Sequence, residues 1–216
     1  MYLRRVNSEL LDQLSYTNPD AIRSRSDLVK INLFTRNFAW LRKKLHKICS
    51  SHDHLIELGA GDGKFSNQFC NLGLKRTCVD LWPKPNDLNP KIDWLKSDVK
   101  QISTYGKNNV VFANLFIHHL TNVEISDLGK KLNLSARVII FCEPQRSRKV
   151  HYLLKIFLLL INANYVTRHD AHVSVDAGFK DNELSDLLGL DPNHWDINYN
   201  YSILGIVRFT AIRRAV

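Results

Sequence analysis

A glycine-rich turn between a short apolar segment and a helix-like segment constrains the fold of this chain most. Residues 54–58 (His-Leu-Ile-Glu-Leu) run directly into the turn Gly59-Ala60-Gly61-Asp62-Gly63. Glycine adopts positive φ angles easily and lets a ligand approach the backbone closely. A strand that passes through such a turn into a helix is typical of the ligand-binding edge of an open α/β sheet.

Apolar segments and helix-like segments alternate along the rest of the chain, which indicates βαβ units. We predict strands at 54–58, 75–81, 92–95, 109–116 and 137–142, with helices at about 62–72, 101–106 and 121–133. After residue 144 we predict an apolar helix at 148–162, a short helix at 181–188, and strands at 194–201 and 206–212, whereas 163–180 has no clear period. The expected fold class is α/β: a seven-stranded, mostly parallel, doubly wound sheet that ends in an antiparallel hairpin.

The N-terminal quarter of the chain reads as a helical cap. Apolar residues recur there at helical spacing, and Ser26-Asp27 is the predicted start of the helix; the residues of this stripe are Ile31, Phe34, Phe38, Leu41, Leu45 and Ile48. A chain of 216 residues is long enough to bury a full core. We therefore predict a single domain over 1–216, with a helical cap at 1–50 and a helix and loop over the acceptor site at 145–180.

The charge, the cysteine positions and the apolar runs limit which kinds of ligand and which cellular compartment we expect for this chain. The 30 Lys and Arg residues against 21 Asp and Glu give a net charge of +9, which attracts anions such as nucleic acid, although the basic residues are dispersed. No Cys or His spacing fits a tetrahedral zinc site, so we predict no metal. The N-terminus lacks the apolar core of a signal peptide, and the apolar run 152–161 is about half of a membrane span. We expect a soluble cytoplasmic protein.

The spacing of the turn distinguishes between ligands. A dinucleotide fingerprint needs a third glycine at position 64, where the chain has Lys64, and a P-loop needs a glycine before that lysine and a hydroxyl after it. Glu57 at the end of the strand would repel a pyrophosphate, whereas it suits a ligand that carries an amine and a sulfonium. Asp80 ends the second predicted strand at the distance where this fold places a carboxylate on ribose hydroxyls, and Asp98 follows the third.

These motifs resemble the class I methyltransferases that depend on S-adenosyl-L-methionine (SAM), and the run 114–119 (Asn-Leu-Phe-Ile-His-His) with Glu143-Pro144 looks like their small-molecule subgroup. The resemblance covers residues 50–145 and the terminal hairpin. It implies that the turn holds the methionyl part of SAM, Asp80 the ribose, and Asp98-Val99 the adenine. The residues expected to contact the cofactor, or its product S-adenosyl-L-homocysteine (SAH), are Glu57, Gly59, Ala60, Gly61, Gly63, Asp80, Leu81, Asp98, Val99, Asn114 and Arg36.

The implied function is methyl transfer from SAM to a small-molecule acceptor, on oxygen or carbon of an aromatic or lipid-like metabolite that is free or carrier-bound. The alternatives are an RNA or other nucleic-acid methyltransferase and a non-catalytic cofactor-binding subunit. Enzymes that methylate base amino groups usually carry a proline pair directly after this asparagine. Here Leu115-Phe116 follows Asn114 directly, which argues against nucleic acid as the substrate. The pathway, the methylated atom and the oligomeric state are not predicted.

Candidate acceptor-site residues carry titratable or charged groups near the expected edge of the sheet. The candidates for proton transfer are His118, His119, His169 and Asp170, and those for acceptor binding are Glu143, Arg146, His119 and His169. Each has a plain alternative: His118 and His119 can cap or pack at a junction, His169 can lie in a solvated loop, and Arg36 and Arg146 can be surface arginines. The strongly apolar helix around 153–161 either packs in the core or forms one wall of an apolar acceptor pocket.

Overall fold

The computed structural model has a seven-stranded sheet with the strand order β3-β2-β1-β4-β5-β7-β6. It describes residues 3–15, 17–68, 73–103, 105–106 and 109–215. The strands are β1 (His54–Leu58), β2 (Lys75–Asp80), β3 (Asp93–Lys96), β4 (Asn109–Asn114), β5 (Ala136–Pro144), β6 (Trp195–Tyr201) and β7 (Ile206–Arg213). The strands β1 to β5 pair in parallel, and β7 pairs antiparallel with both β5 and β6. The predicted mixed sheet is therefore confirmed, and the strand order reverses between β1 and β4.

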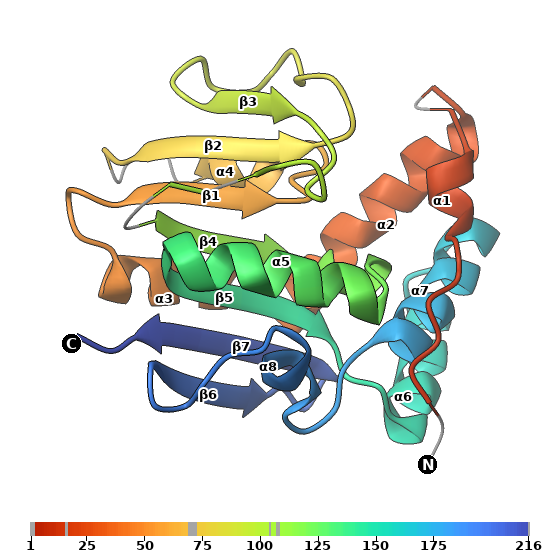
Figure 1. The fold of residues 1–216 in the computed structure, drawn as a ribbon. Coiled ribbons are helices and arrows are strands. Elements are labelled where there is room, and N and C mark those ends of the chain that lie inside the picture. Colours follow the sequence, from red (N-terminus) through yellow and green to blue (C-terminus); the bar gives the residue numbers. More distant parts are fainter. Residues whose placement is uncertain (1–2, 16, 69–72, 104, 107–108, 216) are drawn as a thin grey trace.

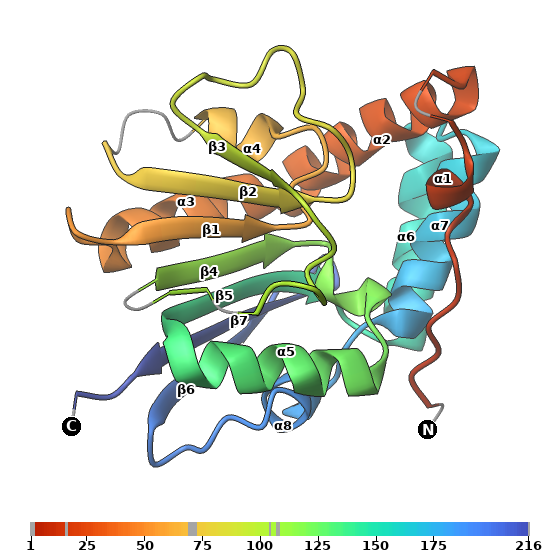
Figure 2. The ribbon, with the colours of Figure 1, turned by 45° about the horizontal axis from the view of Figure 1, so that its top comes forward.

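The helices form two layers and a cap (Figures 1 and 2). They are α1 (Leu10–Gln13), α2 (Pro19–Thr35), α3 (Asn37–Ile48), α4 (Lys64–Gln68), α5 (Asn122–Ser135), α6 (Arg148–Leu160), α7 (Tyr165–Ala177) and α8 (Glu183–Leu187), with a 3-10 helix η2 at Ile117–His119. The helices α5 and α8 cover one face of the sheet, and α3 and α4 cover the other. The helices α1, α2, α6 and α7 gather beyond the carboxyl ends of the parallel strands, where an open sheet binds ligands (Figure 1).

The N-terminal cap differs from the single helix expected to start at Ser26-Asp27. The helix α2 begins earlier, at Pro19, because the Asn18 side chain accepts from the backbone N–H groups of the first turn. It ends at Thr35, because the next residue, Arg36, has a left-handed φ of 56°, and α3 begins at Asn37. Asp27 does not cap a helix; it is fully buried and accepts from the Asn164 backbone N–H.

Two more segments correct the sequence-based expectations. Residues 163–180 show no clear period in the sequence, yet α7 runs through them, because its buried side interrupts the apolar residues Val166 and Val175 with the polar Thr167 and Asp170. Thr167 donates to Asp27 and lies within hydrogen-bond distance of the Ser24 hydroxyl. In the opposite sense, the described part of 101–106 forms no helix, and Tyr105 instead packs into the core. Cys70 lies outside the described residues.

The core consists of two apolar layers, one on each face of the sheet. On one face Ile125, Leu128 and Leu132 of α5 pack against the sheet, and on the other face Leu41 and Leu45 of α3 do so. Among the described residues no helix is long and apolar enough to cross a membrane. The two layers hold the parallel strands rigidly, so the loops at their carboxyl ends are fixed in place.

Candidate active site

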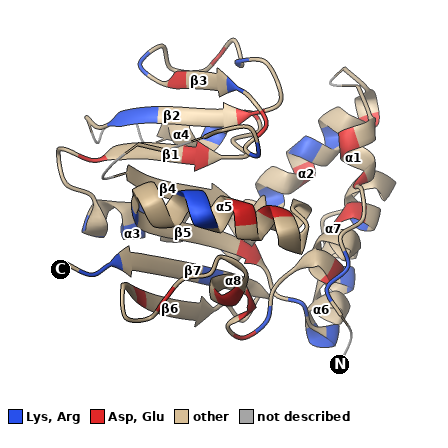
Figure 3. Ribbon diagram, in the orientation of Figure 1, with Lys and Arg blue, Asp and Glu red and all other residues tan. Residues whose placement is uncertain are grey.

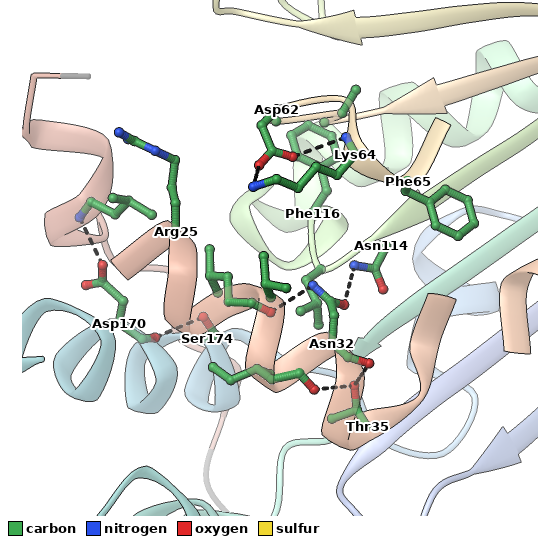
Figure 4. Close-up of a pocket in the computed structure, with 18 of the residues that line it drawn as sticks. Arg25, Asn32, Thr35, Asp62, Lys64, Phe65, Asn114, Phe116, Asp170 and Ser174 are labelled. Carbon is green, nitrogen blue, oxygen red and sulfur yellow. Dashed lines mark hydrogen bonds and ion pairs between the residues drawn. The ribbon is translucent and has the colours of Figure 1, made fainter. Parts of the chain in front are cut away.

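A cavity of about 1790 Å³ lies between the carboxyl ends of the strands and the helical cap. The turn after β1 and the ends of β2 and β4 form one side, and α2, α6 and α7 form the other. Figure 4 shows this arrangement: Asp62 of the turn and Lys64 at the start of α4 lie opposite Asp170 and Ser174 of α7. Binding pockets for a single small ligand usually measure about 300–1,000 Å³, so this cavity has room for two molecules side by side.

The glycine turn presents bare backbone to this cavity. Gly59 has a φ of 64° and Gly61 a φ of 59°, which other residues adopt only with strain. The backbone N–H groups of Gly59 and Ala60 donate to the Val79 carbonyl at 2.9 and 3.2 Å and fasten the turn to β2. A Cβ on Gly61 would meet no atom within 4 Å, whereas one on Gly59 would lie 2.1 Å from the Phe116 ring. The turn therefore leaves open space at Gly61 for a ligand.

Glu57 contributes a buried carboxylate under the turn. It is 4% exposed, and it accepts hydrogen bonds from the Ser66 hydroxyl and, at 3.7 Å, from the Cys78 thiol. Burial raises the pKa of Glu57 to about 7, although these two hydrogen bonds oppose the shift. A ligand amine beside Glu57 would supply a cationic partner for this buried carboxylate.

The raised pKa of Glu57 makes the stability of the ligand-free protein depend on pH. An acid whose pKa is raised by folding stabilises the fold below its unfolded pKa near 4.5, and this contribution is lost as the pH rises through about 7. Glu57→Gln should remove this loss, so the variant should gain up to about 3 kcal/mol of unfolding free energy over wild type between pH 4.5 and pH 8. Urea unfolding at both pH values measures the difference, and identical pH profiles would refute the assignment.

Asp80 and Asp98 occupy the ends of the next two strands on the same side of the cavity. Asp80 accepts from the backbone N–H of Gly61 at 2.7 Å and of Trp82 at 3.0 Å, and it lines the cavity together with the exposed Leu81. Burial raises the pKa of Asp80, against the effect of these hydrogen bonds. Asp98 lies farther along the cavity with Val99, and its carboxylate pairs with Lys100 at 3.3 Å. The spacing of these acids suits a long polar ligand.

Residues from the cap close the cavity over the turn. The Asn114 amide donates to the Asn32 side chain at 2.9 Å, which ties the end of β4 to α2 (Figure 4). Arg36 lines the cavity from the break between α2 and α3. Asn32 had no signal in the sequence, because its partner lies 82 residues away.

His118 and His119 come together at η2 beside a fully buried carboxylate. Glu143 accepts from the backbone N–H groups of Phe116, Ile117 and His118 and lies 2.7 Å from His118 Nδ1. Burial alone would lower the pKa of His118, but Glu143 and Glu9 outweigh it and raise the pKa to about 9. Burial and the charge on His118 lower the pKa of His119 to about 4. Both imidazoles line the cavity.

The other predicted acceptor-site residues lie elsewhere. Glu143 holds the backbone of η2 and does not line the cavity, which differs from the expected role of facing the acceptor. Arg146 is also buried away from it, where it donates to the Gly178 carbonyl and pairs with Glu183. His169 is half exposed and outside the lining, whereas Asp170 lines the cavity and accepts from the backbone N–H groups at the start of α1.

The electrostatic pattern of the molecule is uneven. Acidic residues lie at the carboxyl ends of β1, β2 and β5, whereas Lys and Arg are scattered over α2, α5, α6 and the start of β2 (Figure 3). A nucleic-acid interface would gather basic residues along one face beside the cavity. The lining of the cavity is instead largely apolar, and its charged residues carry both signs, with Asp80 and Asp98 beside Arg36 and Lys64.

The comparisons with known proteins point to one fold. No family model and no curated protein matches the sequence. The plantazolicin methyltransferase BpumL in complex with SAH is 14% identical, with a TM-score of 0.70 over 95% of this chain and 94% of that one. The plantazolicin methyltransferase BamL, in complex with a triazolic desmethylPZN analog and SAH, is 10% identical, with a TM-score of 0.72 over 95% and 93%.

A third solved structure extends the likeness beyond plantazolicin enzymes. Magnesium protoporphyrin IX methyltransferase (ChlM) from Synechocystis PCC 6803, with bound SAH, is 13% identical, with a TM-score of 0.54 over 94% of this chain and 91% of that one. Each match spans nearly the whole of both chains, so the cap and the terminal hairpin belong to the shared architecture. The chain therefore has the class I methyltransferase fold, as the sequence motifs predicted.

Proposed function

We propose that this protein transfers the methyl group of SAM to a small-molecule acceptor. The observation that carries the proposal is the convergence of two positive-φ glycines and three strand-end acids on one cavity at the reversal of strand order. The similar folds of methyltransferases that bind SAH support it. When bound, SAM supplies an electrophilic methyl group on a sulfonium.

The residues of the turn and the strand ends suit the parts of SAM in order. Glu57 and the backbone of Gly59, Ala60 and Gly61 would hold the methionyl amine, with Arg36 on the carboxylate. Asp80 beside Leu81 would accept from the ribose hydroxyls, and Asp98 with Val99 would bind the adenine. Gly63 shapes the turn and Asn114 ties the cap over it. These roles fit the open space at Gly61 and the acids along the cavity.

The apolar walls of the cavity favour an aromatic or lipid-like acceptor. Leu153, Phe157 and Leu160 of α6 and Phe34 of α2 line it, and the rings of Phe34 and Phe157 stack on each other with centroids 4.0 Å apart. Methyl transfer needs the acceptor atom, the methyl carbon and the sulfur in line, with water excluded, and apolar walls achieve both. We propose O- or C-methylation of a free or carrier-bound metabolite by this one domain.

The cellular setting is also part of the proposal. Cys49, Cys78 and Cys142 are free thiols, as expected in a reducing compartment. These thiols support a cytoplasmic enzyme.

Asp80→Ala tests the cofactor assignment. Removing a carboxylate that accepts from ribose hydroxyls should weaken SAH binding by about 1–3 kcal/mol, which is about 5- to 150-fold in the dissociation constant. Asp93→Ala is the matched control, because Asp93 is an exposed aspartate at the opposite end of the sheet. Isothermal titration calorimetry should show a loss for Asp80→Ala alone, and equal affinities in both variants would contradict the assignment.

A further inference from the structure

Two imidazoles and one carboxylate converge on a point beside the cavity. His118 Nε2 lies 3.6 Å and His119 Nε2 lies 3.9 Å from Glu9 Oε1. One ligand atom from each of the three residues lies within 4.8 Å of the others. Ligand atoms that share one ion at about 2.0–2.1 Å are about 3.3–4.2 Å apart, so a small closure brings this set to bonding distance.

Among the described residues, His118 offers a buried nitrogen that lies in ion-pair distance of Glu9 but makes no hydrogen bond. Its side chain is 3% exposed, and Nε2 has no hydrogen-bond partner although it points toward Glu9 and His119. The other ring nitrogen, Nδ1, lies 2.7 Å from Glu143. A carboxylate on the far nitrogen of a histidine is the usual second layer of a metal site, since it fixes the ring and raises its basicity as a ligand.

The three ligands come from two parts of the chain, and hydrogen bonds to the backbone fix both parts. Three backbone N–H groups donate to Glu143 and lock η2, which carries both histidines. Asp170 accepts from the N–H groups of Leu10 and Leu11, so it holds α1 against α7 and sets Glu9 in place (Figures 1 and 2). The Ser174 hydroxyl also donates to Glu9 and orients its carboxylate.

The surroundings favour an added positive charge. Asp12 lies 3.7 Å from His119 Nδ1, and Asp170 and Glu143 stand nearby, against one arginine, Arg4, whose guanidinium donates to the His118 carbonyl. Glu9, Asp12, His118 and His119 all line the cavity. An ion held there by three protein ligands keeps coordination positions open toward the acceptor side.

We propose that Glu9, His118 and His119 bind a divalent transition-metal ion of the zinc or iron type, with Glu143 as the outer carboxylate. Two imidazoles and one carboxylate on a face are a donor set that such ions prefer. Binding displaces the proton from His118 Nε2. The role of the ion rests on the proposed function: it holds an oxygen of the acceptor beside the SAM site and lowers the pKa of a bound hydroxyl. No sequence pattern indicates this metal site, because Glu9 lies more than 100 residues from the histidines.

Cobalt titration of the chelator-stripped protein tests the site. Co²⁺ bound by two imidazoles and a carboxylate gives visible absorption, so we expect one saturating equivalent per chain, displaced by one equivalent of Zn²⁺. His119→Ala and Glu9→Gln should each weaken Co²⁺ binding at least tenfold, and neither residue fills the core. His194→Ala is the matched control, since His194 is 65% exposed and pairs with Asp191 in the loop before β6; it should bind Co²⁺ as wild type does.

The results that would contradict the metal site differ from those that would contradict the proposed function. Absence of a saturable cobalt spectrum, or equal affinities in His119→Ala and His194→Ala, would mean that His118 is only a cation between Glu9 and Glu143. SAH titration of the same preparations separates the two claims. SAH binding without cobalt binding overturns the metal site alone, and cobalt binding without SAH binding overturns the methyltransferase proposal and leaves the metal site standing.

Discussion

Gly59→Ala is expected to abolish measurable SAH binding, with an affinity loss of at least about 100-fold. The Cβ would lie 2.1 Å from the Phe116 ring and 2.8 Å from the Phe116 Cβ, so Phe116 and the backbone around it must move. Alanine at a φ of 64° adds about 1–2 kcal/mol of strain. Both effects displace the turn that we propose as the cofactor site. Calorimetry with SAH and a thermal unfolding curve measure the two consequences.

Gly73→Ala is the matched control for this substitution. Gly73 has a φ of 65°, and a Cβ there would meet no atom within 4 Å. It should therefore lose stability to the same backbone strain while it keeps the wild-type affinity for SAH. If Gly59→Ala binds SAH within threefold of the control, the turn does not form the cofactor site.

Glu143→Ala should lower the unfolding free energy by about 3–5 kcal/mol, the cost of opening a buried charged network. The carboxylate is fully buried and accepts from three backbone N–H groups, and its loss leaves these donors and His118 Nδ1 without a partner. The variant tests whether Glu143 organises η2, which sequence reasoning did not predict. Urea unfolding at constant pH measures the change.

Glu124→Ala controls for the loss of a glutamate that also accepts backbone and hydroxyl hydrogen bonds. Glu124 closes the capping box at the start of α5 in a partly exposed position. Its removal should cost only about 1 kcal/mol. A similar small loss in Glu143→Ala would show that water replaces the carboxylate and that the network is not the anchor of η2.

The sequence predicted the sheet and the glycine turn after β1 well, because both depend on local sequence patterns. Each strand is a short apolar run, and the turn with Glu57, Asp80 and Asp98 follows from strand ends and glycine spacing. The helices of the cap were harder to predict, because polar contacts attach them to one another. Thr167 and Asp170 of α7 are buried through bonds to α2 and α1, so no apolar period reveals the helix.

The acceptor side of the site depends on contacts between distant residues. Glu143 looked like a residue that faces the acceptor, yet its partners at η2 lie about 26 residues earlier. The break between α2 and α3 depends on a left-handed conformation at Arg36, and an arginine in the sequence does not predict that conformation. Glu9 meets the two histidines only because Asp170 fixes the first helix. Single-sequence patterns carry none of these pairings.

A crystal structure of the protein grown with SAH is the decisive test of the proposed cofactor site. We expect the sulfur and amine over Gly59 and Gly61, the ribose hydroxyls at Asp80 and the adenine beside Asp98. An empty cavity in an intact fold, or SAH bound away from the turn, would contradict it.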